Sequence, residues 1–305
     1  MIVRKNPAPV VSIRKDKPSW AKPLPPFDLH RDLRQFVSIT RIPVLSTHLT
    51  QEDHLYQGWE QRRKVQLRMS RRYRNSERAV TADAYVLSYV ASEATRHLNR
   101  AGVAITRLDI KPRHMLDAMA LPSDDDSVRL LVQALRRLTA TVIDVRNWGP
   151  RAFADRSPLL QIQAVSDHTY RLYLSDWLQE ELFSHRVIKI SPEALRLKGL
   201  QGLLYGWAVG RVGPEHCDGR IIRQREALAR AGSFPSGCEP WEEIVQAVGA
   251  NDVPGFKFAL ETFEGLPAIA VTPRGYHSEF DMPSFTLEMD FPSPEPIPLP
   301  REITI

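Results

Sequence analysis

The sequence is poor in cysteine, with only Cys217 and Cys238 among its 305 residues. Neither belongs to a C-x-x-C pair, so the chain offers neither a disulfide framework nor the paired thiolates of a zinc module. Sparse, unpaired cysteine is typical of proteins from a reducing compartment. His216, Cys217 and Asp218 are consecutive, and three consecutive residues cannot converge on one ion from a regular element. We therefore expect no metal and no cofactor.

Long apolar segments are also absent. The most apolar run, residues 200–212, is shorter than the roughly 20 residues that a membrane-spanning helix needs. The first residues include cations but no apolar stretch follows them, so we expect no signal peptide. These observations predict a cytoplasmic protein without a membrane partner.

The common catalytic motifs are missing as well. The sequence has no G-x-x-x-x-G-K-[ST] loop for ATP phosphates and no H-E-x-x-H or G-x-S-x-G site. It also has no His-x-His pair, which a metal-dependent DNA-nicking initiator would combine with a tyrosine. The sequence therefore predicts that the protein is not an enzyme.

Positive charge, by contrast, is present and unevenly distributed. The formal net charge of +5 favours an anionic partner. The densest basic segment follows Glu60, and its cations are Arg62, Arg63, Lys64, Arg68, Arg71, Arg72 and Arg74. We interpret it as a helix with charge on several sides that contacts DNA phosphates. The alternative is a charged helix that only faces solvent.

Both ends of the chain are rich in proline. Residues 1–27 combine cations with prolines and are predicted to be disordered, because proline lacks the backbone donor that a helix interior needs. Residues 275–305 alternate proline with acids and are typical of a polyproline-type tail. We expect neither end to contribute to a core.

Between these tails the hydrophobic periodicity predicts an α+β protein. In residues 28–175 it predicts helices over 84–98, 112–120 and 124–138, and strands over 103–110, 140–145, 160–165 and 170–174. In residues 176–274 it predicts a linker helix over 176–184, a strand over 188–190, helices over 195–212, 225–231 and 241–248, and a hairpin over 256–263 and 268–272. Helices followed by a hairpin are the order of a winged helix, so the sequence predicts two tandem winged-helix domains.

The helix over 124–138 is the best candidate for reading DNA. Asp124–Asp126 suit its first turn, because acids favour the positive end of the helix dipole. Its predicted buried stripe comprises Val128, Leu130, Leu131, Ala134, Leu135 and Leu138. Its other face comprises Arg129, Gln133, Arg136 and Arg137. Arginine can bind guanine and glutamine can bind adenine in the major groove, so we interpret this face as a DNA contact, with a solvated helix face as the alternative.

The second domain has fewer candidates. Its predicted DNA contacts are Arg223, Arg225, Gln246 and Lys257. Gly202, Gly206 and Gly210 recur every fourth residue on an apolar helix and permit close backbone approach. This stripe predicts packing against the neighbouring wing or, alternatively, a dimer seam.

Several segments resemble the plasmid replication initiator protein A family. The sequence Tyr-Arg-Leu-Tyr-Leu-Ser-Asp-Trp-Leu, from Tyr170, is similar to a family strand that ends in Leu-Ser-Asp-Trp-Leu. Val-Ile-Lys-Ile-Ser follows from Val187, and Ala-Leu-Arg-Leu-Lys-Gly-Leu-Gln-Gly-Leu-Leu-Tyr, from Ala194, is similar to the next family helix. Looser similarity at Ala134–Thr139 and Ala231–Ser233 extends the resemblance over roughly residues 81–274.

The resemblance implies tandem winged helices that bind repeated origin sequences in double-stranded DNA. It also implies recruitment of host replication proteins, such as the helicase or its loader, and a monomer–dimer balance in which one form represses its own promoter. The chain departs from the family pattern in two places. The segment from Gly206, Gly-Trp-Ala-Val-Gly-Arg-Val-Gly, is far less basic, and the last helix has Glu242, Glu243 and Gln246 where the family has arginines.

Other functions stay open on the residues alone. A winged-helix repressor without a role in replication would carry the same helices and cations. An enzyme with a tyrosine nucleophile would nick supercoiled DNA, and an interaction scaffold would use its basic segment to bind acidic proteins. We take forward an initiator that acts by binding DNA.

Overall fold

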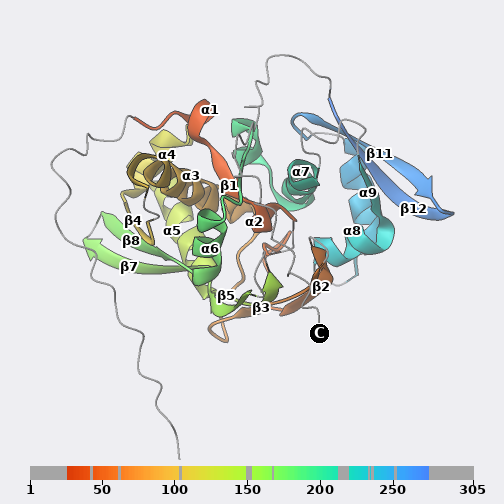
Figure 1. Cartoon of the computed structure of the whole chain (residues 1–305), viewed down its shortest axis with the longest axis horizontal. Coiled ribbons are helices and arrows are strands. Elements are labelled where there is room, and N and C mark those ends of the chain that lie inside the picture. The colour runs from red at the N-terminus through yellow and green to blue at the C-terminus, as the bar shows by residue number, and fades with distance from the viewer. Residues whose placement is uncertain are drawn as a thin grey trace, which may run out of the picture.

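The computed structural model describes residues 26–41, 44–60, 63–102, 105–148, 153–166, 168–211, 220–232, 234, 237–250 and 253–274. The segments 1–25 and 275–305, which hold most of the predicted tails, and the sequence His216–Asp218 lie outside these ranges. The described chain is a mixed α and β structure whose strands form several small sheets (Figure 1). None of its described helices is both long enough and apolar enough to cross a membrane.

The structure has two clusters of buried apolar side chains, which we call the first and the second core. The main elements that pack around the first core are called the first module. They are α3 (Ala84–Ala101), β4 (Arg107–Ile110), α4 (Pro112–Ala118), α5 (Asp125–Ala140), β7 (Leu160–Ser166) and β8 (Thr169–Leu174). The three strands form an antiparallel sheet in the order β4-β8-β7. Asp124 caps α5 by accepting a hydrogen bond from the Ser127 backbone N–H at 2.7 Å. The predicted helices and strands of this region are confirmed.

A separate four-stranded sheet is connected to the first module through β5, which directly follows α5. It comprises β2 (His54–Glu60), β3 (Arg63–Arg71), β5 (Thr141–Trp148) and β6 (Phe153–Pro158), in the antiparallel order β2-β3-β5-β6. Val65, Leu67 and Met69 are buried in the first core, while the residues between them face outward. The prediction that this basic segment is a helix was therefore wrong, because its apolar residues recur with the period of two that a half-buried strand requires.

The elements around the second core, which we call the second module, repeat the order of the first. They are α7 (Gly199–Arg211), β10 (Arg220–Arg223), α8 (Gln224–Ala231), α9 (Pro240–Ala250), β11 (Phe256–Phe263) and β12 (Leu266–Pro273). Their sheet has the order β10-β12-β11. Trp207, Ile222, Ile244 and Ile269 are buried at its centre. Gly232 follows the end of α8 with a positive φ of 80°, a conformation that favours glycine.

Two predictions for the middle of the chain need correction, and the predicted linker helix is present. The strand near residue 188 is β9 (Val187–Lys189), which pairs with β1 (Arg34–Phe36) and not with the second sheet. The first strand of that sheet is β10, which the sequence did not reveal because four residues are too few to show a period. The predicted helix 195–212 is divided into the 3-10 helix η2 (Pro192–Arg196) and α7. The predicted linker helix, α6 (Asp176–Phe183), packs Trp177, Leu178 and Leu182 into the first core.

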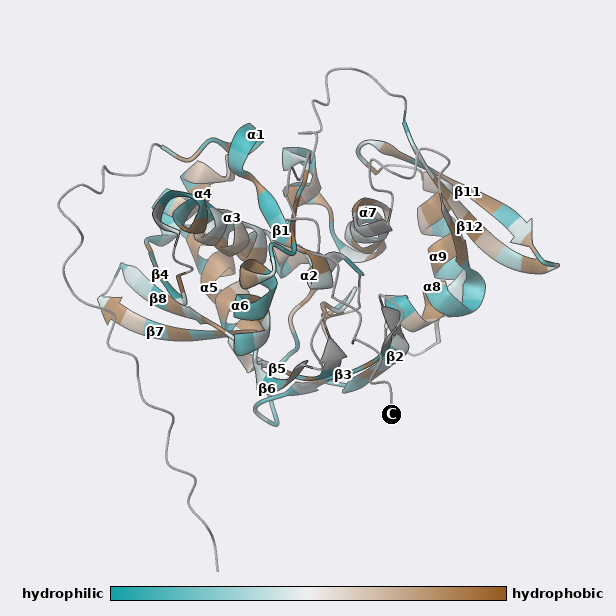
Figure 2. Ribbon diagram, in the orientation of Figure 1, coloured by the Kyte–Doolittle hydropathy of each residue, from teal (hydrophilic) through white to brown (hydrophobic). Residues whose placement is uncertain are grey.

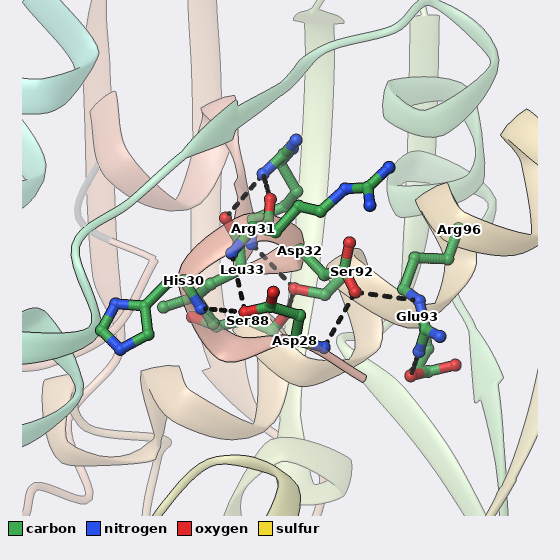
Figure 3. Close-up of polar contacts among 10 residues, drawn as sticks. Asp28, His30, Arg31, Asp32, Leu33, Ser88, Ser92, Glu93 and Arg96 are labelled. Carbon is green, nitrogen blue, oxygen red and sulfur yellow. Dashed lines mark hydrogen bonds and ion pairs between the residues drawn. The ribbon is translucent and has the colours of Figure 1, made fainter. Parts of the chain in front are cut away.

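The segment before β1 is fastened to α3 (Figure 3). Asp28 caps α1 (Leu29–Asp32) by accepting hydrogen bonds from the backbone N–H groups of residues 30 and 31. The backbone N–H of Arg34 donates to Ser92 Oγ at 2.8 Å, and Arg96 pairs with Asp32 at 3.3 Å. Phe27, predicted to lie in the disordered segment, instead packs on Tyr89 with 5.7 Å between ring centroids.

The glycine stripe of α7 packs within the chain. A Cβ at Gly206 would lie 3.2 Å from the carbonyl oxygen of Thr40, and one at Gly210 would lie 2.9 Å from the side chains of Thr40 and Arg41. Gly206 and Gly210 therefore face α2 (Val37–Arg41), whereas a Cβ at Gly202 would lie 3.4 Å from Thr81. Intramolecular packing is confirmed, although the partner is α2 and not a wing.

The second module also touches the four-stranded sheet. The guanidinium of Arg230 on α8 lies over the ring of Tyr56 on β2, 5.6 Å from its centroid, and the Arg230 residue is 2% exposed. His54 is half-buried beside them, and its pKa is lowered, mainly by burial and further by the charge of Arg78. Figure 1 shows the sheet reaching from beneath α5 and α6 toward α8.

The close contact between α7 and α2 predicts an asymmetric response to leucine. Gly206→Leu should destabilise the protein by about 2 kcal/mol, because the side chain would overlap the backbone of α2. Gly249→Leu on α9 is the control, because nothing lies within 4 Å of a Cβ there, and it should leave stability unchanged or slightly raised. Urea unfolding of both variants measures the difference; equal losses would contradict the assigned contact.

Candidate nucleic-acid interface

The outward face of α5 presents polar side chains to solvent. Arg129, Gln133 and Arg136 are exposed, while Leu131 and Leu135 on the other side of the helix are buried. Arg129 pairs with Asp126 at 3.1 Å, but both side chains are more than two-thirds exposed, so the pair contributes little and a stronger anion can displace it.

Leu130 lies on this outward face. Its residue is 57% exposed, so its predicted place in the buried stripe was wrong. The core of the module is filled by Leu131, Ala134, Leu135 and Leu138. Leu130 directly precedes Leu131, so its side chain points about 100° away from that of Leu131. An exposed leucine beside the polar face is suited to an apolar contact such as a thymine methyl group.

Arg137 differs from its neighbour Arg136. Its Nε and one Nη donate to the two carboxylate oxygens of Asp83 at 2.9 and 2.6 Å, and Asp83 is 1% exposed. Asp83 also accepts a hydrogen bond from the backbone N–H of Val80. The hydrogen bonds to Asp83 raise the pKa of Arg137. This guanidinium holds α5 against the start of α3, which leaves Arg129, Gln133 and Arg136 as the exposed polar groups of the face.

The hairpin of β7 and β8 lies beside α5, because β7 packs directly on that helix. Gln161, Gln163 and Ser166 on β7 are exposed, as is His168 next to the turn. Tyr173 donates its hydroxyl to Gln163 Oε1 at 3.0 Å and thereby supports the hairpin. Polar donors therefore extend the α5 face along the hairpin.

The basic segment is divided between the sheet and a turn. Lys64 and Arg68 are exposed on the outer face of β3, and Arg68 pairs with Asp53 at 3.0 Å. Arg71, at the end of β3, donates to the carbonyl oxygen of Arg74 and to Gln51 Oε1. Arg72 and Arg74 are exposed in the turn that follows β3. Arg62 lies outside the described residues, and the structure describes only the backbone of Arg63.

Two arginines that the sequence did not single out share the outer face of this sheet. Arg146 on β5 and Arg156 on β6 are both exposed. The pairing register aligns Arg68 with Asp144 and Asp144 with Arg156. Strand pairing between distant segments produces this cluster, and no local spacing in the sequence reveals it.

The predicted contacts of the second module do not come together. Arg223 and Lys257 lie on the two outer strands of the sheet, at opposite ends of the β11–β12 hairpin. Arg223 pairs with Glu264 at 2.9 Å and stacks on Phe263, and Arg225 is exposed on α8, which Figure 2 shows as largely hydrophilic. Gln246 is exposed on α9, a helix without lysine or arginine, together with Glu242. Among its described residues, helix α9 therefore has no cationic face like that of α5.

Comparison with known proteins supplies a family. The family model described as replication initiator protein A matches residues 34–258. No curated protein matches the sequence. The chain is similar in fold to the crystal structure of a selenomethionine derivative of domains 2 and 3 of RctB, with a TM-score of 0.53 and 10% identity, over 78% of this chain and 97% of that one. A second crystal structure of these RctB domains gives a TM-score of 0.48 at 11% identity, over 77% and 95%.

Substitution of the two adjacent arginines of α5 should have very different effects on stability. Arg137→Gln should lower the free energy of unfolding by about 3 kcal/mol, because it leaves the buried Asp83 carboxylate without its cation. Arg136→Gln, the same chemical change on the exposed face, should stay within about 0.5 kcal/mol of the parent. Urea unfolding at neutral pH measures both. Similar losses in the two variants would show that Arg137 is not the structural partner of Asp83.

Proposed function

The chain belongs to the replication initiator protein A family, and from this premise we propose that it initiates replication by binding duplex DNA through its first module. In this proposal the protein acts by binding DNA and catalyses no covalent step. The observation that carries this proposal is the face of α5, where Arg129, Gln133 and Arg136 are exposed while the opposite face is fixed in the core.

We further propose that both modules are winged helices. Each has the order helix, strand, helix, helix, strand, strand, except that β5 and β6 intervene between α5 and β7 in the first module, and in each sheet the first strand pairs with the third. In this arrangement α5 and α9 are the recognition helices, and the β7–β8 and β11–β12 hairpins are the wings. A recognition helix of this kind enters the major groove while the wing lies against the sugar–phosphate backbone.

The chemistry of the α5 face fits base reading. Arg129 and Arg136 can each form a bidentate contact with guanine O6 and N7, and Gln133 can form one with adenine N6 and N7. These side chains lie four and three residues apart, so they follow one side of the helix along about two turns. The acids in the first turn, Asp125 and Asp126, oppose phosphate there and favour insertion of the middle of the helix.

The second module contributes less to this contact. The exposed positions of α9 include Glu242 and Gln246 but no cation, so its charge repels phosphate. Arg225 and Lys257 are its free cations among the predicted contacts. We propose that family functions such as recognition of repeated origin sequences, recruitment of the host helicase or its loader, and repression of the chain's own promoter build on the contact of the first module.

Selection and titration test the proposal. Duplexes that the full chain retains from a randomised pool define its site, and their affinity is then measured over a range of salt concentrations. A variant with Arg129→Gln, Gln133→Ala and Arg136→Gln should bind the selected duplex at least about tenfold more weakly and lose sequence preference, since each bidentate contact discriminates by about 1–3 kcal/mol.

The matched control is Arg196→Gln with Lys198→Gln, which removes the same number of charges from exposed positions before α7. It should bind like the parent. The proposal fails if the parent selects no duplex, or if the α5 variant binds the selected duplex as tightly as the control does.

A further inference from the structure

The outer face of the four-stranded sheet is a second cationic surface, separate from α5. Its described cations come from three strands: Lys64 and Arg68 on β3, Arg146 on β5 and Arg156 on β6. The inner face of the same sheet is buried in the first core, with Val65, Leu67, Met69, Ile143 and Val145 among its side chains. Because alternate residues of a strand face opposite sides, burial of these residues fixes the cations on the solvent side.

The strand register places these cations in rows. Leu55, Arg68, Asp144 and Arg156 occupy one row across the four strands, and Gln57, Gln66 and Arg146 occupy the next. Neighbouring strands lie about 4.8 Å apart and residues advance about 3.4 Å along a strand. The cations therefore cover a patch of about 10 by 14 Å. A patch of this size is large enough to contact more than one phosphate of a duplex.

These cations are available to a ligand. Within the part of the chain that the structure describes, neither Lys64 nor Arg156 pairs with a carboxylate. Arg68 pairs with Asp53 and Arg146 with Asp144 at 3.4 Å, but the two arginine side chains are 62% and 63% exposed. Exposed ion pairs of this kind contribute at most about 1 kcal/mol, so phosphate oxygens can replace the carboxylates.

The polar groups of this surface match a phosphate backbone. Besides the cations, the outer-face positions whose side chains the structure describes are Leu55, Gln57, Gln66, Ser70, Val142, Asp144 and Pro158. Arginine, lysine and glutamine side chains donate hydrogen bonds to phosphate oxygens, and the duplex that α5 is proposed to hold carries such a backbone.

The sheet is also rigidly joined to α5. Strand β5 begins at Thr141, the residue after the end of α5. Thr141 Oγ1 donates to the Arg137 carbonyl oxygen at 2.8 Å and accepts from the Ala79 backbone N–H at 2.7 Å. The position of the sheet relative to α5 is therefore fixed.

From these observations, and resting on the proposed function, we propose that the outer face of this sheet binds the phosphate backbone of duplex DNA adjacent to the segment that α5 holds. Arg146 and Arg156 are the contacts that distinguish this surface from the basic segment of β3. The contact adds affinity without adding sequence preference, because phosphates carry no base identity.

Two variants of the full chain test the surface in opposite directions. Arg146→Gln with Arg156→Gln should weaken binding to the selected duplex by about tenfold at 0.1 M salt and reduce the log–log salt slope by about 1.8, with sequence preference unchanged. Asp144→Asn should tighten binding several-fold, because it removes the carboxylate between Arg68 and Arg156. A gain in affinity cannot result from unfolding. Arg196→Gln with Lys198→Gln again serves as the charge-matched control.

The possible outcomes distinguish failure of the sheet proposal from failure of the proposed function. If the α5 variant behaves as expected but both sheet variants match the control in affinity and slope, the sheet proposal is overturned and the proposed function stands. If the parent binds no duplex, the proposed function itself fails. A sheet variant that weakens only single-stranded DNA, or that changes only self-association in sedimentation, would also overturn the proposal by giving the surface another occupant.

Discussion

Burial of apolar side chains in the first core leaves the cations of the same helix and strands exposed to solvent. Helix α5 and the four-stranded sheet each bury one face against the same set of apolar side chains, and the opposite faces carry the cations together with exposed leucines such as Leu130 and Leu55. Helical and strand periodicity then determine which residues are exposed: Gln133 and Arg136 on α5, Lys64 and Arg68 on β3. The candidate DNA surface is therefore a consequence of packing, and the Asp83–Arg137 pair fixes α5 within it.

The same packing joins the two modules. β1 pairs with β9, α2 packs on the glycine stripe of α7, and Arg230 on α8 lies over Tyr56 on the sheet. The first two contacts use residues that precede the first module in sequence. The N-terminal segment Asp28–Arg41 thus contacts both modules, which have separate cores. A rearrangement of the modules would have to break these buried contacts.

Local patterns were enough to predict most of the elements. Apolar residues at helical spacing located α3 and α5, and the β-branched run after residue 140 located β5. The family resemblance was drawn from the residues of β8, α6 and α7, and the matched range of residues 34–258 includes them. The helix predicted for the basic segment rested on the spacing of its cations, whereas the alternation of Val65, Leu67 and Met69 specifies the strand β3.

The candidate site was harder to predict because it depends on contacts between distant segments. Arg136 and Arg137 look equivalent in sequence, and only the position of Asp83, on another element, separates an exposed group from a structural one. Arg146 and Arg156 join Arg68 only through strand pairing. The separation of Arg223 from Lys257 has the same origin, since sheet order placed them on opposite edges.

Gln133 and Gln246 offer a matched comparison of the two modules, because each is an exposed glutamine within its proposed recognition helix. A photo-crosslinking residue placed at either position in the full chain reports directly on which helix lies against bound duplex. The account predicts efficient cross-linking from position 133 and weak cross-linking from position 246. Efficient cross-linking from position 246 alone would contradict it, because the DNA would then lie on the helix that carries acids and no cation.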